Sequence, residues 1–255
     1  MRRARQLFDW TLILALPVAS VAAIVGSAVM LGASDSATAP ASYTMAPPAP
    51  EPATPGVALS DQSSSPAVPD LDARVTRFLQ DRRWGWRDMN VPEGDGRALY
   101  DIVVKNGYKR ALEIGTSTGH SGIWTAWALS KTGGKLITID IDEGRHREAV
   151  ANFKEAGVDR FIDARLADAH DLVPQLGGPF DFVFIDADKE WYVNYAKAVI
   201  PKLTAGACIA AHNVSAGRGR RFGMGGDYYA FITSLPEFET TVINGQLAIS
   251  YRRAK

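Results

Sequence analysis

The chain has 255 residues, and its 28 Lys and Arg residues balance 28 Asp and Glu residues, so its formal net charge at pH 7 is zero. No long basic stripe interrupts its second half, and we therefore expect no nucleic-acid partner. The length admits one catalytic domain with an N-terminal appendage, and the single cysteine, Cys208, cannot form an internal disulfide.

The first 33 residues are typical of a membrane-directed segment. Arg2, Arg3 and Arg5 precede residues 11–33, which carry no charge, and roughly 20 apolar residues suffice to cross a bilayer. We expect a single N-terminal apolar helix that anchors the chain, with the arginines on the cytoplasmic side. The alternative is a signal peptide cleaved near the small residues Ala37 and Ala39, which would leave an exported protein.

Residues 34–70 differ in composition from the rest of the chain. They are rich in Ala, Pro, Ser and Thr and poor in large apolar side chains. Such a segment cannot bury a core, so the sequence predicts a disordered linker over 34–70 and a folded domain over 71–255.

Within 71–255, strand-like and helix-like segments alternate, which predicts an α/β fold with a Rossmann-like, doubly wound and mostly parallel sheet. Two β-rich runs, 238–243 and 246–251, then flank Asn244-Gly245, a strong signal for an antiparallel hairpin. A class I methyltransferase fold ends in such a hairpin, whereas a nicotinamide dehydrogenase does not. The predicted strands are 110–114, 135–139, 161–164, 180–185 and 208–211, and the predicted helices are 121–130, 143–156, 171–175 and 191–203.

A glycine-rich turn follows the first predicted strand and indicates a nucleotide-type cofactor. Its order is Glu-x-Gly-x-x-x-Gly at Glu113, Gly115 and Gly119, and the next strand ends in Asp140. A dinucleotide site needs Gly-x-Gly-x-x-Gly to approach a pyrophosphate closely. The carboxylate of Glu113 would repel a diphosphate but suits a cation, so the pattern favours S-adenosylmethionine, which carries a sulfonium and an ammonium.

Four motifs together resemble the cation-dependent O-methyltransferases, the family of catechol and caffeoyl-coenzyme A O-methyltransferases. They are Met89-Asn90-Val91, the stretch from Glu113 to Ser121, the run Phe182-Val183-Phe184-Ile185-Asp186-Ala187-Asp188-Lys189, and Ala210-Ala211-His212-Asn213. The resemblance implies a cofactor site built from Met89, Val91, Glu113, Gly115, Ser121, Asp140, Asp168, Ala169 and Asp186. It also implies that Asp186 is a metal ligand and that Lys189 is the catalytic base.

The fourth motif departs from the family, which has Asp-Asn where this chain has His212-Asn213. Three oxygen donors would suit magnesium, whereas an imidazole suits manganese, iron, cobalt, nickel or zinc. Three alternatives follow: a softer divalent ion held by Asp186, His212 and Asn213; a metal-independent site with His212 as the base; or a packed histidine in a site that has lost activity.

The sequence thus predicts an S-adenosylmethionine-dependent O-methyltransferase acting on a small catechol-like or other vicinally oxygenated substrate. A bound divalent ion would lower the pKa of the substrate hydroxyl, and Lys189 would take its proton. A non-catalytic S-adenosylmethionine-binding module on a membrane is an alternative, and a homodimer is possible. A nicotinamide oxidoreductase is disfavoured by Glu113 and by the terminal hairpin.

Overall fold

The structure, a computed structural model, describes residues 70–86, 89–216 and 226–254. The predicted membrane segment 1–33 and all but the last residue of the predicted linker 34–70 lie outside these ranges. Within the ranges, no helix combines the length and the apolar character that a bilayer crossing requires.

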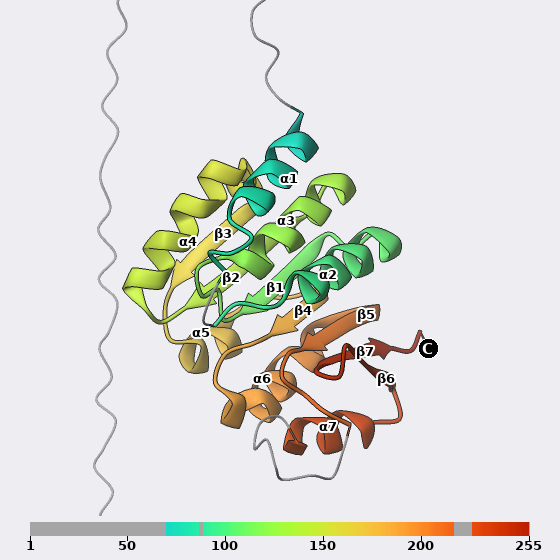
Figure 1. The fold of residues 1–255 in the computed structure, drawn as a ribbon. Helices are drawn as coiled ribbons and strands as arrows, with labels where there is room; N and C mark the ends of the chain where they lie inside the picture. The colour runs from blue at the N-terminus through green and yellow to red at the C-terminus, as the bar shows by residue number, and fades with distance from the viewer. Residues whose placement is uncertain (1–69, 87–88, 217–225, 255) are drawn as a thin grey trace, which may run out of the picture. The chain divides into compact units, whose positions relative to one another are not determined.

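Seven strands form one mixed sheet, as the alternation and the terminal hairpin predicted (Figure 1). Their order is β3-β2-β1-β4-β5-β7-β6. The pairs among β1 to β5 are parallel, and β7 is antiparallel to both β5 and β6. The strands are β1 (Arg110–Ile114), β2 (Lys135–Asp140), β3 (Ile162–Leu166), β4 (Phe180–Ile185), β5 (Leu203–Ala211), β6 (Phe238–Ile243) and β7 (Leu247–Arg252).

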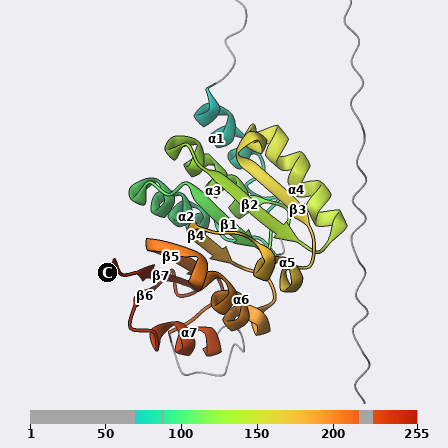
Figure 2. The same cartoon turned by 180° about the vertical axis from the view of Figure 1, so that it is seen from behind.

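Helices cover both faces of the sheet. Helices α1 to α4 lie on one face and α5 to α7 on the other, as the opposite views of Figures 1 and 2 show. They are α1 (Leu71–Asp81), α2 (Glu93–Asn106), α3 (His120–Thr132), α4 (Glu143–Ala156), α5 (Ala169–Gln175), α6 (Tyr192–Val199) and α7 (Gly226–Thr233). This arrangement gives the sheet a buried core on each side, as expected for parallel strands.

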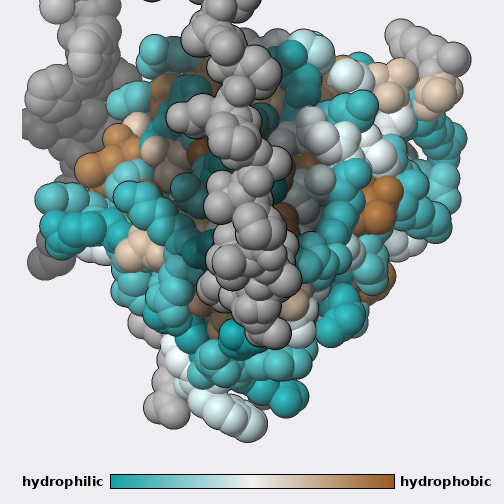
Figure 3. Space-filling view, turned by 90° about the horizontal axis from the view of Figure 1, so that it is seen from above, coloured by the Kyte–Doolittle hydropathy of each residue, from teal (hydrophilic) through white to brown (hydrophobic). Residues whose placement is uncertain are grey.

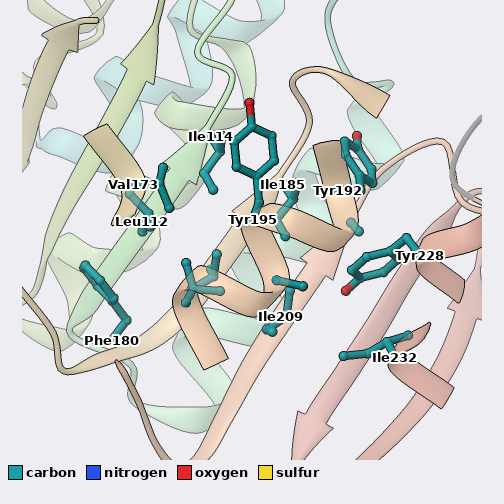
Figure 4. Packing of buried hydrophobic residues seen from close by; sticks show 14 of the residues in the cluster. Leu112, Ile114, Val173, Phe180, Ile185, Tyr192, Tyr195, Ile209, Tyr228 and Ile232 are labelled. Carbon is teal, nitrogen blue, oxygen red and sulfur yellow. The ribbon is translucent and has the colours of Figure 1, made fainter. Parts of the chain in front are cut away.

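Side-chain alternation along the strands divides the core between the two faces. On β1, Leu112 and Ile114 pack with α5 to α7, whereas Ala111 packs with α2 and α3. Figure 4 shows the first of these clusters, in which strand side chains meet Tyr192 and Tyr195 of α6. The tyrosines of α6 are therefore anchored in the core directly beside the end of β4.

The terminal hairpin turns where the sequence predicts. Asn244 and Gly245 have φ angles of 52° and 74°, and the amide of Gln246 donates to the carbonyl of Ile243 at 3.2 Å. Two left-handed residues in succession match the right-handed twist of the flanking strands. The hairpin places β7 against β5 and brings the turn toward the carboxyl end of β5.

The coloured part of the face in Figure 3 is mostly hydrophilic. The exposed large hydrophobic residues in the described ranges are Trp84, Met89, Val104, Ile141 and Leu166. Of these, Met89 and Ile141 line a cavity of about 670 Å³ at the carboxyl ends of the parallel strands. Single exposed apolar residues are common on soluble domains, so these two are of interest only for their place at that cavity.

Candidate active site

A cavity of about 670 Å³ opens at the carboxyl ends of the parallel strands. The strand order reverses between β1 and β4, and open α/β sheets bind ligands at such a switch point. The volume is that of an ordinary small-molecule site. The predicted site residues that line it are Met89, Gly115, Asp140, Asp168, Ala169, Asp186, Lys189, His212 and Asn213.

Gly115 lets the ends of β1 and β4 come together. Its φ is 101°, and a Cβ atom at this position would lie 2.6 Å from the carbonyl oxygen of Asp186. Real Cβ atoms do not approach a backbone oxygen so closely, so only glycine fits here without displacing β4. The glycine thus sets the position of Asp186 as well as the floor of the cavity.

Glu113, two residues before Gly115 on β1, is completely buried. Burial raises its pKa to about 7, although the hydroxyls of Ser121 and Thr138 act in the opposite direction. Thr138 Oγ1 donates to Glu113 Oε2 at 2.6 Å. The other oxygen, Oε1, has no hydrogen-bond partner of good geometry among the described residues. Glu113 is therefore a carboxylate without full compensation, close to the cavity but not on its wall.

Asp140, at the end of β2, presents an oriented carboxylate to the cavity. The amide of Ser117 donates to its Oδ2 at 2.7 Å, and the amide of Asp142 donates to its Oδ1 at 2.9 Å. Asp142 instead caps α4 by accepting from the amide of Arg145 at 2.8 Å. The two amides fix the Asp140 side chain and leave its remaining lone pairs for a ligand.

Asp168, Ala169 and His170 line the cavity where β3 leads into α5. Asp168 caps α5, because its Oδ1 accepts from the amide of His170 at 2.8 Å. The imidazole of His170 stacks on Trp191 with ring centroids 3.8 Å apart. This side of the cavity therefore offers a planar, aromatic wall next to a carboxylate, which suits a flat heterocycle.

Met89 and Val91 have different environments. Met89 lines the cavity and is 62% exposed, whereas Val91 is buried and its carbonyl faces His120 Nδ1 at 2.9 Å. Trp124 Nε1 donates to His120 Nε2 at 3.1 Å, so Nδ1 carries the proton of the ring. Burial lowers the pKa of His120 to about 4. A neutral His120 thus fixes the segment that contains Met89 against α3.

Asp186 follows β4 and interacts with Lys189 and Tyr192. Lys189 Nζ donates to Asp186 Oδ1 and to Tyr192 Oη, the latter at 2.7 Å. Tyr192 Oη lies 3.3 Å from Asp186 Oδ1 and 3.1 Å from the carbonyl of His212. Burial, with a further contribution from Asp186, raises the pKa of Tyr192 well above its usual value. Tyr192 therefore keeps its phenolic proton, which it donates toward Asp186 or the carbonyl of His212 while its oxygen accepts from Lys189.

His212 lies between two carboxylates. Its Nδ1 is 3.2 Å from Asp186 Oδ2, and its Nε2 is 3.1 Å from Asp95 Oδ2. Asp95, in the first turn of α2, also accepts from Asn244 Nδ2 at 2.7 Å and from Gln246 Nε2 at 2.9 Å. The hairpin turn, α2 and the end of β5 therefore meet at the Asp95–His212 pair.

The predicted metal ligands Asp186, His212 and Asn213 all line the cavity. Both ring nitrogens of His212 face carboxylate oxygens, and both oxygens of Asp186 face cationic or donor groups. Asn213 lines the cavity, but no group of three or more His, Cys, Asp or Glu residues in the described ranges could hold a metal. His212 Nε2 pairs with Asp95 Oδ2 at 3.1 Å, a contact that a metal-ligating histidine also makes through its second nitrogen. A metal ion at Asp186, His212 and Asn213 stays a prediction.

Sequence reasoning missed Asp95 and Tyr192, which complete the cluster around Asp186. Asp95 lies far from the other site residues in the sequence, and its only signal is an acidic residue in the first turn of a helix, which is also typical of a surface position. Tyr192 follows the end of the predicted strand 180–185 by seven residues. Of the predicted residues, Val91, Glu113 and Ser121 are not among the described residues that line the cavity.

The chain is similar to proteins described as O-methyltransferases. The model of a family described as O-methyltransferase matches residues 63–218. A catechol O-methyltransferase of Niastella koreensis is 37% identical over 134 residues, 51% of this chain and 60% of that protein. A caffeoyl-CoA O-methyltransferase of Medicago sativa is 32% identical over 134 residues, 50% of this chain and 54% of that protein. The chain thus spans little more than half the length of these curated relatives.

A solved structure has the same fold over most of its length. The O-methyltransferase from Bacillus cereus, in complex with SAH, superposes with a TM-score of 0.60 and 26% identity. The match covers 74% of this chain and 94% of the Bacillus protein. The mixed sheet with C-terminal antiparallel strands is therefore shared with a protein that has been crystallised with a cofactor product.

Proposed function

Since the chain belongs to the O-methyltransferase family, we propose that it transfers the methyl group of S-adenosylmethionine to a hydroxyl group of a small substrate. The names of the two curated relatives favour a catechol-like or other vicinally oxygenated compound. The observation that carries the proposal is the cavity itself, in which the oriented carboxylate of Asp140 and the amine of Lys189 line one continuous space.

The charges around the cavity support a cationic cofactor. Asp140 would accept the ribose hydroxyls through the lone pairs that its two amide partners leave available. Asp168, Ala169 and His170 would border the adenine. Gly115 would border the methionine part, whereas Glu113 and Ser121, which the resemblance assigns to the same part, do not line the cavity.

The reaction is an in-line displacement. The substrate oxygen attacks the methyl carbon, the bond between carbon and sulfur breaks, and its electron pair stays on sulfur to give the neutral thioether. A phenol has a pKa near 10, as tyrosine does, so few substrate molecules are ionised at neutral pH. Lys189 would take the proton, and the walls of the cavity would hold oxygen, carbon and sulfur in line.

A methyl-transfer assay tests this proposal. The full chain is incubated with labelled S-adenosylmethionine and a dihydroxyphenol, and cofactor binding is measured separately by calorimetry. We expect both binding and labelled product, and we expect Lys189→Met to abolish the product while binding persists. Binding without turnover on any phenol, in the wild-type chain, would favour the non-catalytic module instead.

We also propose, from residues 1–33, that the chain is held at a membrane by one N-terminal helix. Support comes from the uncharged run 11–33 and the arginines that precede it. Cell fractionation with alkaline washing tests this proposal. The full chain should stay in the membrane fraction and a chain lacking residues 1–33 should not, whereas a shortened mature chain in the medium would indicate signal cleavage.

A further inference from the structure

A second cavity, of about 480 Å³, lies between α1, α2 and α3. Its lining comes from these helices and from the described part of the segment that joins α1 to α2. Val91 lines this cavity, whereas Met89 and Asn90, its neighbours in the chain, line the main cavity. The two cavities have no described lining residue in common. The second cavity is therefore a separate space, with the volume of a small-molecule site.

The wall of this cavity is aromatic. Trp86 stacks on His120 with ring centroids 4.6 Å apart, and the centroids of Trp124 and Trp127 are 5.6 Å apart; all four rings line the cavity. Trp124 Nε1 donates to His120 Nε2 at 3.1 Å, and Trp127 Nε1 donates to Asp72 Oδ1 at 2.7 Å. These bonds fix the rings of α3, so the wall offers preformed, flat apolar surface to a ligand.

Gly96 brings α2 close to this wall. A Cβ atom at Gly96 would lie 2.3 Å from Trp124 Cδ1, a distance that real Cβ atoms do not show. Only glycine therefore lets α2 pack directly on the indole. The contact holds the first turns of α2, which carry Glu93 and Arg97, at the edge of the aromatic wall.

Two arginines give the cavity a positive edge. Arg83 Nε lies 3.6 Å from Glu93 Oε2, and an Nη atom of Arg97 lies 3.8 Å from Glu93 Oε1. Both distances are too long for good hydrogen bonds, and no other carboxylate in the described ranges pairs with either arginine. One carboxylate shared by two guanidinium groups leaves an excess positive charge, and guanidinium groups bind carboxylates through parallel N–H donors.

Ring and charge lie side by side. Arg97 Cζ is 5.6 Å from the ring centroid of Trp124, so an acid group on a ring packed against the tryptophans would come within reach of the guanidinium. The indole N–H of Trp86 is enclosed and meets no acceptor among the described residues, and a buried donor without a partner is costly. Both observations favour a ligand that carries an acceptor group on a flat ring.

We propose that this second cavity binds a small aromatic carboxylate, at a site apart from that of methyl transfer. The ring packs against Trp124 and Trp127, and the carboxylate pairs with Arg97 and Arg83 in competition with Glu93. A cationic ring would be repelled by the two arginines, and an inorganic anion would leave the aromatic wall uncovered. The inference does not depend on the proposed methyl transfer, because none of these residues lines the main cavity.

The first experiment measures ligand binding on the full chain. The probe is 2-naphthoate, which has two fused rings, one carboxylate and no hydroxyl that could accept a methyl group. We expect calorimetry to show saturable binding of one molecule per chain, and the neutral 2-naphthamide to bind about tenfold or more weakly, since it lacks the charge. No saturable binding of 2-naphthoate, or equal affinities of acid and amide, would overturn the proposal.

Charge variants locate the bound acid. Arg97→Gln should weaken 2-naphthoate binding about tenfold or more. Arg147→Gln, a change at an exposed arginine of α4, is the matched control and should bind as the wild type does. Lys189→Met, in the main cavity, should also bind as the wild type does. Binding that is lost in Lys189→Met but kept in Arg97→Gln would place the acid in the main cavity and refute the proposal.

A steric variant keeps both arginines. Thr76 and Ala73 are exposed positions on α1, and of the two only Thr76 lines the second cavity. Thr76→Trp should fill the cavity and abolish 2-naphthoate binding, whereas Ala73→Trp should keep it, with circular dichroism as the check that both variants fold. Undiminished binding in a folded Thr76→Trp protein would contradict the proposal. So would a dimer, seen by sedimentation, that Thr76→Trp dissociates and 2-naphthoate disrupts, since the cavity would then belong to an interface between two copies.

Discussion

Replacing Glu113 with glutamine should remove a pH dependence of stability from the ligand-free protein. Burial raises the pKa of Glu113 from 4.5 to about 7 in the folded state, so the folded protein binds the proton more tightly than the unfolded chain does. The stability that this protonation provides is fully present below pH 4.5 and is lost as the pH rises through 7.

The expected size follows from the shift. A difference of about 2.5 pKa units at about 1.36 kcal/mol each corresponds to about 3 kcal/mol of unfolding free energy. Because a glutamine side chain cannot ionise, the Glu113→Gln variant should lack this loss, which the wild type undergoes between about pH 5 and about pH 8. The additional amide donor costs roughly 1–3 kcal/mol if it is left unpaired, but this cost is the same at every pH, so the slope is the informative quantity.

Urea unfolding of the full chain, followed by tryptophan fluorescence at several pH values, measures that slope. Glu148→Gln, an exposed change on α4, is the matched control and should behave as the wild type does. If wild type and Glu113→Gln lose stability in parallel with rising pH, Glu113 is ionised throughout this range, and the argument from its burial is wrong.

Three further predictions concern the cavity. Asp140→Asn should weaken S-adenosylmethionine binding about tenfold or more in calorimetry, because hydrogen bonds to a charged group contribute about 1.5–3 kcal/mol. The exposed control Asp163→Asn should bind as the wild type does. Equal affinities of Asp140→Asn and wild type would exclude the ribose role. Gly115→Ala should lower the unfolding free energy by about 2 kcal/mol or more, since the new Cβ meets a backbone oxygen, and unchanged urea midpoints would contradict this. Lys189→Met should reduce kcat about 100-fold or more with an unchanged cofactor Kd, and full activity would rule it out as the base.

Much of the fold could be predicted because the strands are short apolar runs bounded by turn signals. The predicted strand 110–114 matches β1, and Asn244-Gly245 marks the hairpin turn. The predicted helix 191–203 is too long: the α-helix ends at Val199, and a 3₁₀ turn containing Pro201 follows. Proline has no amide to donate to the preceding turn, so the apolar pattern continues past the point where hydrogen bonding ends.

The candidate site was predictable where its residues lie at strand ends. Asp140 and Asp186 follow predicted strands, and carboxyl ends of parallel strands meet at one edge of the sheet. Asp95 could not be found in this way, because its partner His212 lies 117 residues away in the sequence. A contact of that kind depends on where α2 packs, and helix packing leaves no local signal in the sequence.

A crystal structure of the full chain with S-adenosylmethionine bound tests the central claim most directly. The account predicts that the ribose hydroxyls contact Asp140 and that the sulfonium methyl points toward Lys189, with His212 still between its two carboxylates. A cofactor bound in another pocket, or one whose methyl group faces away from Lys189, would contradict it.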